Sequence, residues 1–126
     1  MSIQNKSLIY IFHTFILAPL FFYAGFYGEA SKNKNLVVTL VMYTGIFAAA
    51  YHGYQVCRKK FGSDQGETNS EIPVHINMFH VGISGVFLYL AYEYMQNNEV
   101  SCSTLGAIGG MGIIAGLYHG WKLVNV

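Results

Sequence analysis

Four long segments without a single Asp, Glu, Lys or Arg constrain this chain more than any other feature. They are Leu8–Gly28, Leu36–Cys57, Ile72–Tyr92 and Thr104–Trp121. Each has close to the roughly 20 residues that a helix needs to cross a bilayer. Only 10% of the residues are charged, whereas soluble domains carry about 25%. The sequence therefore predicts an all-α integral membrane protein, a four-helix bundle whose main partner is the lipid bilayer.

Charges beside these segments predict the orientation. Lys6, the run 58–60 and Lys122 share one side of a four-crossing topology. The opposite side carries Lys32 and Lys34, and there acidic residues offset them: Glu29, Glu93 and Glu99. Because an excess of Lys and Arg beside helix ends marks the cytoplasmic side, we expect a multi-pass protein with both termini in the cytoplasm. The net charge of +1 gives no indication of nucleic acid binding.

An internal repeat organises the chain. Shifting the sequence by 67 positions aligns Phe12-His13 with Phe79-His80 and Tyr51-His52-Gly53 with Tyr118-His119-Gly120, since 80 − 13 and 119 − 52 both equal 67. The sequence thus predicts one membrane domain, 1–126, with repeat 1 at 8–57, a polar linker at 58–71 and repeat 2 at 72–126. Each repeat is expected to be a helical hairpin, and the two are expected to be related by a pseudo-two-fold axis along the membrane normal.

The repeat places four histidines at one depth. His13 lies five residues into the first segment and His52 lies five residues before the end of the second. At about 1.5 Å rise per residue, both should lie roughly 7–8 Å below the helix ends on the same side. His80 and His119 occupy the corresponding positions of the second repeat. Since an ionisable residue within a membrane helix is costly, this predicted four-histidine layer is the candidate functional site.

Small residues accompany the histidines in both repeats. Gly45, Ala49 and Gly53 follow one another at intervals of four, as do Gly112, Gly116 and Gly120. Such stripes let membrane helices approach closely. Ala48 and Ala115 each lie four residues before a histidine of the layer. Helix packing explains these stripes, but small side chains beside a histidine also leave room for a planar cofactor, so we include all eight as candidate cofactor-binding residues.

Imidazole is a common neutral metal ligand. Two histidines, His52 with His119 or His13 with His80, are predicted to ligate a b-type haem for electron transfer, with a redox partner or a second copy of the chain as partner. Alternatively, all four hold one Zn²⁺ or Cu²⁺. Further alternatives are a proton or cation pathway through the layer, and a structural protein with no cofactor. The sequence has no legible catalytic constellation, so no catalysed reaction is predicted.

The chain also carries a pattern that is similar to a known group of proteins. Phe12-His13 is followed by Pro19-Leu20 and then by Tyr51-His52-Gly53. With its repetition, this pattern resembles small, duplicated, uncharacterised membrane proteins of large DNA viruses. The second copy departs from it, since Val86-Phe87 stands where Pro-Leu would be. The resemblance covers nearly the whole chain and implies a viral or host-membrane setting, but no established activity.

Overall fold

The structure, a computed structural model, describes residues 3–61, 74–97 and 99–125, and this part of the chain is helical apart from short connections. Its helices are α1 (Ile3–Phe12), the π-helix η1 (His13–Leu17), α2 (Ala18–Tyr27), α3 (Lys34–Phe61), α4 (Val74–Asn97) and α5 (Cys102–Val124). The predicted all-α class is confirmed for these residues. Of the predicted linker, residues 58–61 belong to α3, and residues 62–71 lie outside the described part.

The segments α1, η1 and α2 form one continuous helix with a widened turn. The backbone N–H of Ala18 donates to the carbonyl of His13, five residues back, and the flanking residues keep right-handed helical angles. Pro19 follows directly, and a proline crowds the carbonyl four residues before it and cannot donate to it. A π turn at this place accommodates that disruption. At the aligned position of α4, Val86 lies within an uninterrupted α-helix.

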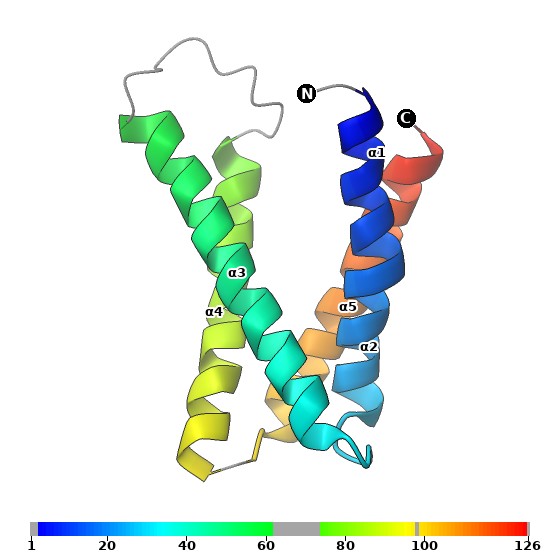
Figure 1. Cartoon of the computed structure of the whole chain (residues 1–126), viewed down its shortest axis with the longest axis vertical. Helices are drawn as coiled ribbons and strands as arrows, with labels where there is room; N and C mark the ends of the chain where they lie inside the picture. The colour runs from blue at the N-terminus through cyan, green and yellow to red at the C-terminus, as the bar shows by residue number, and fades with distance from the viewer. Residues whose placement is uncertain (1–2, 62–73, 98, 126) are drawn as a thin grey trace.

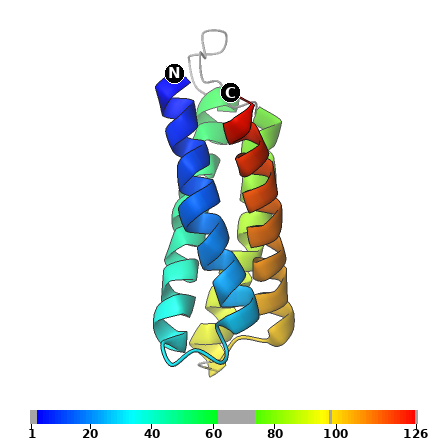
Figure 2. The same ribbon diagram turned by 90° about the vertical axis from the view of Figure 1, so that its right-hand side faces the viewer.

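The helices pack in two pairs, with the first helical run along α5 and α3 along α4 (Figure 1 and Figure 2). Glycines bring the first pair together: a Cβ added at Gly112 would lie 2.6 Å from the backbone nitrogen of Phe22, and one at Gly25 would overlap the backbone of Gly109. In the second pair, Gly45 lies against the side chain of Phe87. The first helical run therefore packs mainly on α5, and α3 packs mainly on α4. The two helices within each predicted hairpin are not each other's main packing partners.

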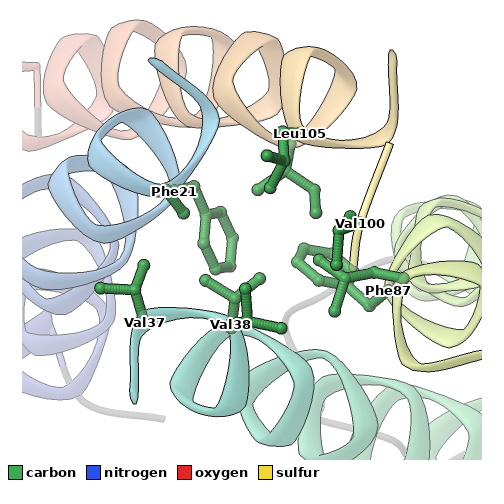
Figure 3. Packing of buried hydrophobic residues seen from close by; sticks show 10 residues of the cluster. Phe21, Val37, Val38, Phe87, Val100 and Leu105 are labelled. Carbon is green, nitrogen blue, oxygen red and sulfur yellow. The ribbon is translucent and has the colours of Figure 1, made fainter. Parts of the chain in front are cut away.

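A buried apolar cluster fills the half of the bundle that holds the short loops. Figure 3 shows its side chains meeting from α2, α3, α4, α5 and the connection between α4 and α5: Phe21, Val37, Val38, Phe87, Leu105 and, from the connection, Val100. The rings of Phe21 and Phe87 have centroids 5.0 Å apart and join the two helix pairs. Both termini lie at the opposite end (Figure 1), so the core fixes the bundle at one end and leaves the cavities described below at the other.

Three helices are long and apolar enough to cross a membrane: Ser7–Tyr27, Lys34–Phe61 and Val74–Gln96. They expose many large apolar side chains, among them Phe15, Phe47 and Leu88. Length and composition thus support a membrane setting for three of the four predicted crossings. Helix α5 (Cys102–Val124) is not among these three.

Candidate functional site

The four histidines of the predicted layer come from four different helical elements and line one cavity. His13 begins η1, His52 lies in α3, His80 in α4 and His119 in α5. The cavity they share has a volume of about 80 Å³ and reaches down to Phe21, Phe87 and Met111 at the apolar core. The four histidines, which the sequence places at equal depth, therefore face the same cavity between the helices.

Within the layer the imidazoles form two close pairs. The ring centroids of His13 and His119 are 4.3 Å apart, with the ring planes 35° from parallel. Those of His52 and His80 are also 4.3 Å apart, at 21°. A shift of 67 positions converts one pair into the other. The pairs that touch are thus His13 with His119 and His52 with His80, whereas the haem hypothesis paired His52 with His119 or His13 with His80.

Three of the four imidazoles have their Nδ1 held by a hydrogen bond. In the first pair His13 donates from Nδ1 to the carbonyl of Ile9, at 2.7 Å. His80 makes the same bond to the carbonyl of Ile76, also at 2.7 Å. The Nδ1 of His52 lies 2.8 Å from the Oδ1 of Asn77. Because Nδ1 carries the proton in these bonds, Nε2 is left with its lone pair, the arrangement in which imidazole ligates a metal.

The fourth imidazole differs, since the Nδ1 of His119 is buried and has no hydrogen-bond partner within residues 3–61, 74–97 and 99–125. Its side chain is 8% exposed, and its ring lies between those of His13 and Tyr10, the latter at a centroid distance of 5.8 Å. Thr14 Oγ1 and Asn77 Nδ2 are likewise buried without a partner among the described residues. Buried polar atoms are almost always paired, so these atoms mark a region where a further group is expected.

Two larger cavities adjoin the layer. A mouth cavity of about 310 Å³ lies toward the termini and includes Tyr10, His75 and Lys122 as well as all four histidines. A lateral groove of about 500 Å³ lies between α4 and α5, with His80 and His119 on its floor. Its walls include the exposed side chains of Phe79 and Ile114, so it lies on the flank that a bilayer would cover.

These volumes decide where a planar cofactor fits. Pockets for such ligands usually measure about 300–1,000 Å³, and the central cavity, at about 80 Å³, is smaller. The lateral groove, at about 500 Å³, falls within the range and offers imidazoles from two facing helices. Among the residues that the structure describes, no three His, Cys, Asp or Glu side chains are arranged to hold a metal ion. The residues therefore fit a haem in the groove better than one Zn²⁺ or Cu²⁺ at the centre.

The small residues serve mainly to pack helices. Gly112 and Gly116 face Ala18, and Gly120 faces Thr14, where added Cβ atoms would lie 2.8, 3.3 and 3.7 Å from the nearest atoms of these two residues. The remaining five are placed as follows: Gly45 meets Phe87, Ala48 and Ala115 line the central cavity, Ala49 is half-buried, and Gly53 has open space around it. Only Ala115 also lines the lateral groove, so packing explains most of the two stripes.

Two further residues of the site were not among the predicted ones. Asn77 is 1% exposed and holds His52, and Tyr10 contacts His119. These two residues occupy aligned positions, since 77 − 10 is also 67. The sequence did carry a signal for Asn77, because an amide within a membrane span needs a hydrogen-bond partner. It carried none for Tyr10, whose ring looks like one more apolar side chain.

Comparison with known proteins adds no assignment. No protein-family model matches the chain, and no curated protein or solved structure is similar to it.

Proposed function

We propose that this chain is a four-crossing membrane protein that binds a b-type haem in the groove between α4 and α5. The observation that carries the proposal is the groove itself, about 500 Å³ in volume, mostly apolar, and bounded by His80 and His119 from facing helices. Facing helices of a bundle commonly build cofactor sites in this way. The proposal includes α5 as the fourth crossing, because the groove needs lipid or a ligand to cover its apolar walls.

The two proposed ligands, His80 and His119, differ in the contacts that hold their rings. His80 donates from Nδ1 to the carbonyl of Ile76, which orients the ring and leaves Nε2 as the ligating atom. His119 is held by ring contacts with His13 and Tyr10, and its buried Nδ1 has no hydrogen-bond partner among the described residues. His80 and His119 would hold the haem, which would supply one-electron chemistry suited to electron transfer with a redox partner.

We further propose that both termini lie in the cytoplasm. The termini are at one end of the bundle (Figure 1), and Arg58, Lys59 and Lys60 form the last turn of α3 at this end. Lys122, in the last turn of α5, adds to the same basic side. The excess of Lys and Arg there supports this orientation. The viral or host-membrane setting that the resemblance implies stays a prediction.

A proton or cation pathway has less support. The histidine layer ends at the apolar core, whose members include Val41, Leu90 and Ile108, all with no exposed surface. The fully buried members of this core, within the described part of the chain, include no titratable side chain to continue a relay toward the loop end. A conducting path would have to bypass it. A purely structural role remains the default if no cofactor binds.

The test is an absorption spectrum of the purified full-length chain, taken as isolated and after titration with ferric haem b. We expect a saturable Soret band with the sharp visible bands of a low-spin, six-coordinate haem on reduction. Elemental analysis for zinc and copper on the same sample separates the metal alternative. A sample with neither a Soret band after titration nor bound metal would sink the cofactor proposal.

A further inference from the structure

The mouth cavity and the lateral groove adjoin each other. Four residues line both of them: Ile76, His80, Tyr118 and His119. The groove is walled by large apolar side chains such as Phe79 and Ile114. The mouth, in contrast, is lined by polar and basic groups at the terminal end of the bundle, including His75 and Lys122. A molecule that filled both parts would need an apolar body and a polar end.

The chemistry of the mouth indicates the charge of that polar end. Lys122 is half-buried, and its Nζ lies 5.0 Å from the centre of the Trp121 ring. It lies three residues after His119, on the same face of α5. No carboxylate is among the side chains that line the mouth within residues 3–61, 74–97 and 99–125. The cavity thus presents the ammonium group of Lys122, which complements an anion.

A second observation concerns His119, which borders both cavities. His119 is more than nine-tenths buried, lines both cavities, and keeps an unpartnered Nδ1. Buried polar atoms are almost always paired, so this nitrogen singles out His119 within the layer. His119 and the basic mouth thus lie beside the same space.

We propose that the groove and the mouth together bind an apolar molecule that carries a carboxylate, with the carboxylate held at Lys122. This deepens the proposed function, on which it rests in the case of haem, because haem has two propionate carboxylates on an otherwise apolar macrocycle. A long-chain fatty acid from the bilayer has the same chemistry. In either case the apolar body lies between α4 and α5, and the acid faces the aqueous side that holds the termini.

The experiment compares each acid with its neutral analogue on the full-length chain in zwitterionic nanodiscs. The probes are ferric haem b and its dimethyl ester, followed by absorbance, and tritiated oleate and oleyl alcohol, followed by protein-dependent binding. The variants are Lys122→Gln, Lys122→Arg and, as a control at the opposite end, Lys32→Gln. Loss of one charge-assisted hydrogen bond should weaken binding of the acid about tenfold. Lys122→Arg should restore it, and the neutral analogues should be unaffected.

The two probe pairs separate the sources of the ligand and the two proposals. If oleate binding depends on Lys122 while haem fails to bind, the haem function is wrong and the carboxylate site stands, with a lipid acid as its ligand. If haem and its dimethyl ester bind equally well to every variant, the haem function stands and the carboxylate site is wrong for that ligand. If neither acid binds more tightly than its neutral analogue, the inference is overturned.

Discussion

The two helix pairs of this bundle carry the same histidines at aligned positions but use them differently. In the pair of α3 and α4, His52 and His80 each have an Nδ1 partner, namely Asn77 and the carbonyl of Ile76. In the other pair, His13 has the carbonyl of Ile9, whereas the Nδ1 of His119 has no hydrogen-bond partner among the described residues. Both imidazoles between α3 and α4 thus have an Nδ1 partner, although the Nδ2 of Asn77 is left without one there. In the other pair, only one of the two imidazoles has an Nδ1 partner.

A single aligned position accounts for this difference. Asn77 provides an amide oxygen to His52, whereas Tyr10, 67 positions earlier, provides only a ring contact to His119. The second pair also has its own geometry, because η1 widens the helix at His13 and glycines bring α2 and α5 into backbone contact. Histidines at aligned positions thus have different hydrogen-bond partners, because the residue opposite each of them differs.

The strongest test of this comparison removes one imidazole from each pair. We expect His119→Ala to abolish the Soret band of added haem, because His119 lines the groove and His52 does not. His52→Ala should keep the band, since its main partner is Asn77. Absorbance titration measures both, and far-ultraviolet circular dichroism checks that each variant keeps its helices. Equal loss of haem in the two variants would contradict the assignment of the groove.

A matched pair of glycine substitutions tests how closely the helices of each pair pack. A Cβ at Gly112 would lie 2.6 Å from the backbone nitrogen of Phe22 and 2.8 Å from the carbonyl oxygen of Ala18, whereas one at Gly53 meets nothing within 4 Å. Because backbone cannot yield locally, Gly112→Ala should lower the free energy of unfolding by about 1–3 kcal/mol. Gly53→Ala should leave it unchanged or raise it by up to about 1 kcal/mol. Unfolding in mixed micelles of increasing SDS content measures both.

A smaller effect is expected from the hydrogen bond that distinguishes the pairs. A double-mutant cycle with His52→Ala and Asn77→Ala should give a coupling energy of about 0.5–2 kcal/mol, as found for hydrogen bonds between membrane helices. The corresponding cycle with His119→Ala and Tyr10→Phe should give a coupling near zero, since the contact of Tyr10 with His119 is through its ring. The same unfolding assay serves. A larger coupling in the second cycle would mean that the Tyr10 hydroxyl supports His119 after all.

Much of this fold follows from the sequence, because uncharged segments of membrane-spanning length have few alternatives to helices. The depth of His13 and His52 also follows, since it depends only on the rise per residue. The packing partners could not be predicted in this way. A glycine stripe such as that of Gly112 and Gly116 can pack against any helix that has small residues at the contact. Only the assembled bundle shows that the stripe packs against α2. The absence of a partner for His119 likewise depends on what lies across the helix interface.

The smallest expected effect concerns the two cysteines, which belong one to each pair. Cys102 begins α5, and its Sγ lies 3.2 Å from the Oε2 of Glu29, just beyond the end of α2. This bond and the charge of the carboxylate raise the pKa of the Cys102 thiol, because negative charge nearby disfavours the thiolate.

Glu29→Gln should therefore lower the pKa of the Cys102 thiol, increase the thiolate fraction at pH 8, and speed alkylation of Cys102 severalfold. Cys57, exposed near the end of α3, is the internal control, and its rate should not change. Mass spectrometry of the detergent-solubilised chain after timed exposure to iodoacetamide measures both rates, and an unchanged Cys102 rate would show that Glu29 does not join the ends of α2 and α5.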